Sequence, residues 1–381
     1  MKQLSAVLFL FASAVVSAQT PALPANVQGR VDAVMPQVVD WRRDFHQHPE
    51  LGNREFRTAG VIASHLESLG MEVTTGVAHT GVVGILHGGR PGPVVALRAD
   101  MDALPVEEQV NLPFASQVRT EYNGQDVGVM HACGHDNHMA ILMGTASVLA
   151  GMRDELPGTV MFIFQPAEEG APEGEEGGAE LMLKEGLFDE LRPDAVFGLH
   201  VWPIPAGQIA VREGGTMASS DSFRIRVQGQ QTHGAAPWAG IDPIVIASQI
   251  VLGLQTIPSR QLDATLTPSI VTVGAINGGL RSNIIPDSVE MIGTLRTFDA
   301  ETRRQIHQRV ERTAKQIAES AGASAEVDIS LGYPVTNNDP ALTRRMSSTL
   351  QRVAGERFAE ASLITGAEDF SYYANEVPGM F

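Results

Sequence analysis

The segment HACGHDNHMA, residues 131–140, gathers three histidines, an aspartate and the only cysteine of the 381-residue chain. Cys133 and His135 lie two residues apart with Gly134 between them, and a turn at this glycine would let both side chains face one point. Thiolate and imidazole groups are ligands that zinc and similar divalent metals favour. The segment therefore indicates a metal site, although a Cys-x-His spacing alone occurs by chance in many chains.

The single cysteine admits two other interpretations. An isolated cysteine is usually an inert buried thiol, and a cysteine nucleophile with a histidine base would make the chain a cysteine hydrolase. The histidines around Cys133 favour a metal ligand over both. A cysteine hydrolase would be insensitive to chelators and would lose activity when Cys133 is alkylated.

Acidic and histidine side chains follow several apolar runs that are typical of strands. Glu168 and Glu169 follow GTVMFIFQPA, His200 follows DAVFGL, and Asp100 and Asp102 end the run GPVVALRADMD. Open α/β sheets build their sites at the carboxyl ends of strands. There, one of the paired glutamates can bind a metal while the other reaches an activated water. The alternative for this pair is a solvated acidic loop.

Seven motifs, in order, resemble those of the peptidase family M20 metalloenzymes. The resemblance is to the amidohydrolase branch, which includes hippurate hydrolases, N-acyl-amino-acid amidohydrolases and auxin-conjugate hydrolases. The motifs are LRADMDALP, HACGHDNHMA, FQPAEEG, GLHVWP, THGAAP, SNIIPD and GAEDFSYY. Seven ordered motifs are far more specific than any one of them, and they extend the resemblance from about Val27 to the last residues.

The resemblance implies a centre with two divalent metal ions, zinc or manganese, with cobalt as a further option. Glu168 resembles the general base, which would take a proton from a metal-activated water and pass it to the leaving amine. Asp102 resembles an aspartate that orients the site, although alone it would be read as a strand cap. Four residues resemble the metal ligands, with the cysteine as a thiolate between the two metals: Cys133, His135, Glu169 and His200.

Three further residues resemble substrate-binding groups. His233 in THGAAP resembles a histidine that helps to hold the developing oxyanion. Asn283 in SNIIPD and Arg296 in GTLRTFD resemble groups that grip the carboxylate or carbonyl of the substrate. An arginine suits a carboxylate because its planar fork donates two hydrogen bonds. Taken alone, Arg296 would be an ordinary solvated strand residue.

The resemblance implies an exported metal-dependent amidohydrolase that cleaves the amide bond of N-acyl amino acids or similar small conjugates. A metallopeptidase acting on small peptides through the same site is one alternative. A second alternative concerns the end of the sequence. The resemblance implies a further strand and a histidine ligand after the final residues EVPGMF. Without that histidine the chain could be a non-catalytic metal-binding protein. We expect instead an enzyme sequence cut short, since every upstream motif is intact.

The elements that must position these residues follow two patterns. Over residues 27–214, amphipathic helices alternate with β-branched runs, which predicts the first part of an α/β catalytic domain with a mostly parallel sheet. Residues 215–331 read as β-α-β-β-α-β, a ferredoxin-like α+β arrangement that the resemblance identifies as a lid domain. Residues 332–381 return to α/β character and would form the second, apparently truncated part of the catalytic domain.

The N-terminus is typical of an export signal. Lys2 precedes an apolar core over residues 4–15, and the small residues 16–18 predict cleavage after Ala18. A buried helix or a membrane anchor is the alternative, but the core is short for a bilayer about 30 Å thick. We therefore expect a signal peptide over residues 1–18 and a periplasmic or extracellular protein.

Charge restricts the class of partner. The formal net charge is −17, and lysine occurs only at positions 2, 184 and 315. Recognition of phosphate backbones and of anionic lipid needs cationic surfaces. We therefore expect a small-molecule partner, no nucleic acid, and no membrane contact after removal of the signal. The resemblance adds a homodimer through the lid domain as one option.

Overall fold

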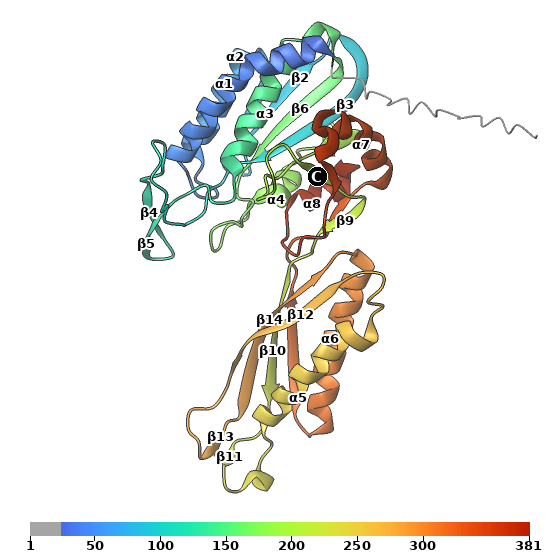
Figure 1. The fold of residues 1–381 in the computed structure, drawn as a ribbon. Coiled ribbons are helices and arrows are strands. Elements are labelled where there is room, and N and C mark those ends of the chain that lie inside the picture. The colour runs from blue at the N-terminus through green and yellow to red at the C-terminus, as the bar shows by residue number, and fades with distance from the viewer. Residues whose placement is uncertain (1–23) are drawn as a thin grey trace, which may run out of the picture.

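The computed structural model describes residues 24–381, so the predicted signal peptide over residues 1–18 lies outside the described residues. The chain forms a larger α/β unit and a smaller unit that extends from it, drawn in yellow and orange in Figure 1. Residues from both ends of the described chain lie in the larger unit. No helix of the described part combines the length and the apolar character that a membrane crossing requires.

The larger unit is built on a six-stranded sheet with the order β1-β2-β6-β3-β7-β18. The pairs β6–β3, β3–β7 and β7–β18 are parallel, whereas β2 pairs antiparallel with both β1 and β6. The sheet is thus mainly parallel, as the sequence predicted, with β2 as the strand of opposite direction. The strands are β1 (Glu72–Val77), β2 (Gly81–His87), β3 (Arg90–Asp100), β6 (Pro157–Gln165), β7 (Ala195–Phe197) and β18 (Gly379–Met380).

Helices pack on both faces of this sheet (Figure 1). One face packs against residues of α1, α2 and α3, and the other against residues of α4 and α8. A third group of apolar residues joins α7 to β7 and β18. The helices are α1 (Ala25–Gln47), α2 (Phe56–Ser68), α3 (His135–Ala150), α4 (Gly178–Lys184), α7 (Pro340–Ala354) and α8 (Phe370–Glu376).

Successive side chains of the run MFIF in strand β6 are all apolar because both faces of the sheet are covered at this strand. Its side chains alternate between the two faces: Phe162 and Phe164 pack in the α1–α3 cluster, whereas Met161 and Ile163 pack in the α4–α8 cluster. All four are buried, and burial of each stabilises the fold by roughly 1.5–3 kcal/mol. The strand is therefore held from both sides up to its carboxyl end, which fixes the position of Glu168 beyond it.

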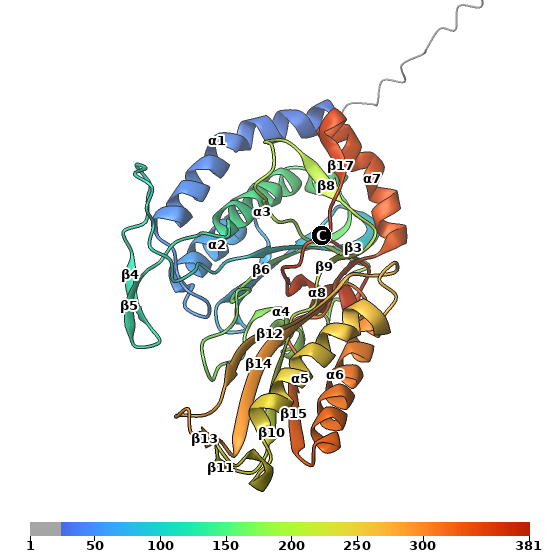
Figure 2. The ribbon, with the colours of Figure 1, turned by 60° about the horizontal axis from the view of Figure 1, so that its bottom comes forward.

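The smaller unit is a four-stranded antiparallel sheet with the order β12-β14-β10-β15. Two helices, α5 and α6, pack on one face of it (Figure 2). The β-α-β-β-α-β order along the chain is the ferredoxin-like order that the sequence predicted. Its elements are β10 (Asp221–Gln228), α5 (Pro243–Thr256), β12 (Ser269–Asn277), β14 (Ser288–Thr297), α6 (Ala300–Ser320) and β15 (Ser324–Ser330).

Short strand pairs complete the fold. A two-stranded ribbon of β11 and β13 lies at the end of the smaller unit remote from the larger unit (Figure 1), and β4 and β5 form a hairpin on the larger unit. The two connections between the units pair with each other as β9 and β16, and β8 pairs with β17. The bounds are β4 (Arg119–Tyr122), β5 (Gln125–Gly128), β8 (Ile209–Val211), β9 (Gly214–Met217), β11 (Thr232–His233), β13 (Ile284–Ile285), β16 (Thr336–Asn338) and β17 (Phe358–Glu360).

Asp221 ties the smaller unit together where the chain enters it. Its buried carboxylate accepts hydrogen bonds from Arg303 Nε at 2.8 Å and from His307 Nε2 at 2.7 Å, both on α6. It also accepts one from the backbone N–H of Gly332 at 3.1 Å, on the returning connection. Burial alone would raise the pKa of Asp221, but the hydrogen bonds from Arg303 and His307 lower it to about 2.

Replacing Asp221 by Asn should therefore lower the free energy of unfolding at pH 7 by roughly 3 kcal/mol, because it leaves the Arg303 charge without its partner. The folded-state pKa lies below the ordinary value of 3.8. The contribution is therefore present above about pH 4 and is lost as the pH falls toward 2. Urea unfolding of both proteins at pH 7 and pH 3 measures the difference, which should shrink at the lower pH. Equal stability at pH 7 would contradict this role, and Glu311→Gln on the exposed side of α6 is the control with little expected change.

Candidate metal centre

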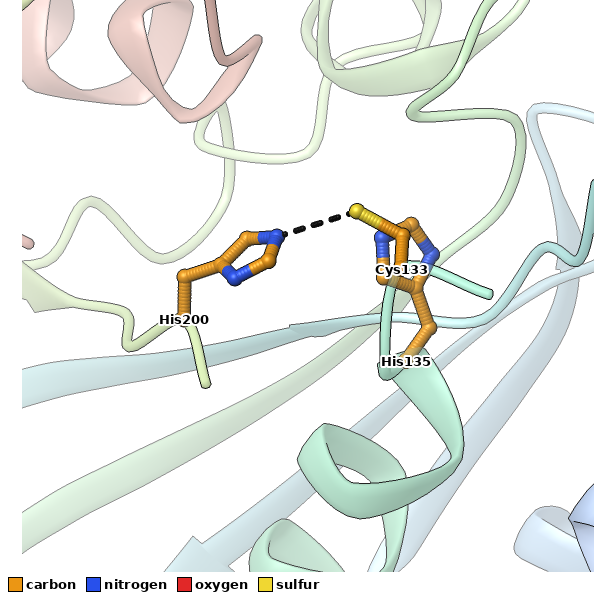
Figure 3. Close-up of side chains that lie close together, drawn as sticks. All are labelled: Cys133, His135 and His200. Carbon is orange, nitrogen blue, oxygen red and sulfur yellow. Dashed lines mark hydrogen bonds between the residues drawn. The ribbon is translucent and has the colours of Figure 1, made fainter. Parts of the chain in front are cut away.

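Side chains from three loops meet at the carboxyl ends of β3, β6 and β7. Figure 3 shows Cys133, His135 and His200 facing one another, with Cys133 Sγ 3.3 Å from His200 Nε2. Potential ligand atoms of these three residues lie within 4.8 Å of one another, and so do those of His135, Glu168 and Glu169. The four predicted ligands and the predicted base therefore form one cluster that shares His135.

Gly134 allows Cys133 and His135, the first two predicted ligands, to converge. Its φ of 95° lies in the left-handed region, which glycine adopts without strain, and α3 begins at the next residue, His135. A Cβ at this position would come within 2.4 Å of Val201 Cγ2. The turn that the sequence predicted between Cys133 and His135 is present, and it also lets the His200 loop approach closely.

The His200 loop is held so that one ring nitrogen faces the cluster. His200 Nδ1 donates a hydrogen bond to Val201 O at 2.5 Å, which leaves the Nε2 lone pair directed at Cys133. His138 Nδ1 donates to Asp100 at 2.6 Å, and its Nε2 accepts from the backbone N–H of Val201 at 2.9 Å. Both nitrogens of His138 are thus used in supporting the loop, and neither remains free to bind a metal.

Asp102 links two of the predicted ligands. Its Oδ1 lies 3.2 Å from His135 Nδ1, and its Oδ2 accepts a hydrogen bond from the backbone N–H of Glu169 at 2.9 Å. On the other side of the ring, His135 Nε2 lies 3.8 Å from Glu168 Oε2. This position is the one expected of the orienting aspartate that the sequence predicted.

The donor set suits a divalent cation. His135 is fully buried. Asp102 Oδ1 lies 3.2 Å from its Nδ1, but neither ring nitrogen makes a well-aligned hydrogen bond among the described residues. Buried polar atoms without partners are rare. Here the His135 ring lies next to the Cys133 thiol, the His200 imidazole and the carboxylates of Glu168 and Glu169. Soft sulfur, imidazole and carboxylate together favour zinc and neighbouring transition metals.

The pKa values of the buried acidic groups also favour a bound cation. Burial raises the pKa of the Glu168 carboxyl well above its ordinary value, and the nearby carboxylates of Glu368 and Asp369 raise it further. Burial also raises the pKa of the Cys133 thiol and of the Glu169 carboxyl. A bound cation would offset each of these shifts, because metal binding displaces protons from its ligands.

Arg98 organises a charged network behind the cluster that the sequence analysis missed. Its buried guanidinium contacts Asp100 at 2.6 Å, Glu368 at 2.9 Å and Asp369 at 2.8 Å. Carboxylate oxygens of Glu368, Asp369 and Glu168 lie within 4.8 Å of one another. The motifs LRADMDALP and GAEDFSYY contain these residues, but nothing in the sequence alone shows that they meet.

The three predicted substrate-binding residues do not join the cluster in this arrangement. His233 lies on β11 and Asn283 directly precedes β13, so both belong to the remote ribbon of the smaller unit (Figure 1). The two segments contact each other, since Gly234 N donates to Asn283 O at 2.8 Å. Arg296 lies on β14, near its end. Their contact with substrate stays a prediction.

Comparisons with known proteins agree with this geometry. Residues 96–381 match the model of peptidase family M20/M25/M40. The N-acyl-L-amino acid amidohydrolase of Geobacillus stearothermophilus is 42% identical over 345 residues, which cover 87% of this chain and 89% of the relative. Thermostable carboxypeptidase 2 of Saccharolobus solfataricus is 40% identical over 352 residues, covering 91% and 86%. The crystal structure of Bacillus subtilis YXEP, a dinuclear metal-binding peptidase of the M20 family, has a TM-score of 0.77 at 39% identity and covers 92% and 88%.

Replacing Gly134 by Ala should weaken zinc binding by at least about tenfold without unfolding the protein. The new Cβ would strain the turn and push on Val201, which moves Cys133 and His200 apart. Competition with a chromophoric chelator measures the zinc affinity, and thermal unfolding of the metal-free protein checks the fold.

Gly60→Ala is the matched control, because Gly60 lies within α2 with no atom within 4 Å of the added Cβ. Alanine at an exposed helical position stabilises by roughly 0.5–1 kcal/mol, and zinc affinity should not change. Unchanged zinc affinity in Gly134→Ala would show that the turn does not position the ligands.

Proposed function

Because the chain belongs to peptidase family M20/M25/M40 and is a metal-dependent hydrolase of amide bonds, we propose that it releases amino acids from small N-acyl amino acids. The observation that carries the proposal is the cluster of Cys133, His135, Glu169 and His200, with the buried Glu168 beside His135 and Glu169. Relatives named N-acyl-L-amino acid amidohydrolase and N-acetylcysteine deacetylase support this substrate class.

In this proposal two divalent ions, zinc or manganese, are held by Cys133, His135, Glu169 and His200. When bound, such ions polarise the amide carbonyl and activate water. Asp102 lies against Nδ1 of His135 and accepts a hydrogen bond from the backbone N–H of Glu169. These contacts hold the donor atoms of both residues in place before a metal binds. Arg98 compensates part of the negative charge behind them.

Glu168 is the proposed general base. Its side chain is buried at the cluster, and its backbone carbonyl accepts a hydrogen bond from Tyr333 Oη at 2.6 Å. It accepts a proton from the attacking water and later passes it to the leaving nitrogen. Proton transfer to and from the reacting groups by one positioned carboxylate is general acid–base catalysis.

The proposal assigns substrate contacts to His233, Asn283 and Arg296 and a homodimer to the smaller unit. Because His233 and Asn283 lie on the remote ribbon, they reach a metal centre only after a large movement of that unit or from a second copy. Several large apolar side chains are exposed on the smaller unit, where such an interface would lie. They include Trp238, Leu252 and Leu280.

Export is the remaining part of the proposal. It rests on the signal-like sequence of residues 1–18, with cleavage after Ala18, and places the enzyme in a periplasm or outside the cell. A metallopeptidase activity stays the second candidate, because thermostable carboxypeptidase 2 of Saccharolobus solfataricus is as similar to this chain as the amidohydrolases are.

Hydrolysis of a panel of N-acyl amino acids and dipeptides tests the function. Turnover should disappear on chelation and return with zinc or manganese. Glu168→Gln should lower kcat by roughly a thousandfold, the scale of general acid–base catalysis, while metal content stays the same. Glu173→Gln, an exposed glutamate of the same loop, is the control and should keep full activity.

Three outcomes would contradict the proposal. Metal binding without turnover of any member of the panel would indicate a metal-binding protein. Chelator-resistant turnover that is lost on alkylation of Cys133 would indicate a cysteine hydrolase. Faster turnover of dipeptides than of acyl amino acids would favour the peptidase.

A further inference from the structure

A cavity of about 460 Å³ adjoins the metal cluster within the larger unit. Asp102 and Glu169 line it beside the cluster, and residues of the β4–β5 hairpin line it as well. Its volume falls in the range of roughly 300–1,000 Å³ that is common for small-molecule sites. A substrate whose amide lies at the cluster can therefore extend one of its two halves into this cavity.

Much of the lining is apolar. Leu51, Leu104 and Val118 contribute half-buried side chains, and Val129 and Pro105 complete this part of the wall. They come from separate segments, since Leu51 follows α1, Leu104 and Pro105 follow β3, and Val118 and Val129 flank the hairpin. An apolar group of the substrate would be removed from water on several sides.

Both cations of the lining already have partners. Arg54 pairs with Glu175, and Arg119 pairs with Asp126 at 2.9 Å and with Glu107. The other ionisable groups of the lining, apart from Tyr122, are carboxylates: Glu50, Asp102, Glu121 and Glu169. Each of the two arginines already contacts a carboxylate, and Glu50 and Glu121 add negative charge to the wall. A carboxylate of the substrate would therefore have to displace an existing partner to form a salt bridge there.

We propose that this cavity is an acyl pocket that receives the acyl half of the substrate and selects uncharged, apolar acyl groups longer than acetyl. The inference rests on the proposed function, because it presupposes an amide at the metal cluster. The free carboxylate of the amino acid then lies on the other side of the cluster, outside the acyl pocket. The substrate class narrows to amino acids that carry medium-length aliphatic or aromatic acyl groups.

Binding can be measured apart from turnover in the zinc-loaded Glu168→Gln protein. The ligands are one amino acid carrying acetyl, butyryl, hexanoyl or succinyl groups, with calorimetry as the readout. Each methylene added from acetyl to hexanoyl should tighten binding by about fourfold, the value for burial of one methylene. Succinyl, which matches butyryl in length but carries a carboxylate, should bind at least about tenfold more weakly than butyryl.

Variants locate the effect. Val118→Phe and Leu104→Phe fill the acyl pocket, so hexanoyl binding should weaken by about tenfold while acetyl binding stays the same. Val127→Phe is the matched control, because Val127 lies on β5 of the same hairpin but does not line the cavity. It should leave the whole series unchanged. Two filling variants are used so that misfolding of one does not decide the result.

The outcomes separate the two proposals. Affinity that does not depend on acyl length, a preference for succinyl, equal effects of Val118→Phe and Val127→Phe, or no binding of any ligand would each overturn the acyl pocket. The unmodified enzyme is assayed by kcat/KM with the same series. Length-dependent binding without any hydrolysis would leave the acyl pocket standing and sink the proposed function, whereas hydrolysis without length dependence would do the reverse.

Discussion

Negative charge buried at the carboxyl ends of the strands is the constraint on which the rest of the site depends. Asp100, Glu368 and Asp369 surround Arg98, and Asp102 and Glu168 are buried close by. Within residues 24–381, Arg98 is the only buried arginine or lysine. A single guanidinium cannot compensate five carboxylates, and burying an uncompensated charge is costly. The raised pKa values of Glu168 and Asp369 express this imbalance, and cations bound beside His135 would relieve it.

The sheet makes this concentration of charge sustainable. Residues of β3 and β6 pair in register up to Asp100 and Gln165, and apolar clusters on both faces hold these strands rigidly. The polar residues that follow them are therefore fixed by the backbone before any metal binds. His138 extends the same order to a third loop, because it joins Asp100 to the backbone beside His200. The positions of the predicted ligands are thus set by buried hydrogen bonds rather than by flexible surface groups.

Much of this could be predicted from the sequence, and the reasons differ between elements. The alternation of amphipathic helices with strand-like runs predicted a mostly parallel sheet, in which MFIF of β6 is apolar at every position because both faces are buried. Gly134 predicted the turn between two of the predicted ligands. Arg98, Glu368 and Asp369 were missed because their role arises only where β3 meets a loop some 270 positions later in the chain. The remote position of His233 could not be predicted either, because local patterns define the ferredoxin-like unit but not its placement against the sheet.

The central claim is that Cys133 is a metal ligand and neither an inert thiol nor a nucleophile. The absorption spectrum of the cobalt(II)-substituted protein tests it most directly, because a thiolate bound to cobalt gives an intense sulfur-to-metal charge-transfer band in the near ultraviolet. The account predicts this band in the unmodified protein and its loss in Cys133→Ser, with cobalt still bound more weakly through the remaining ligands. A spectrum without the band, or one that Cys133→Ser leaves unchanged, would contradict the account.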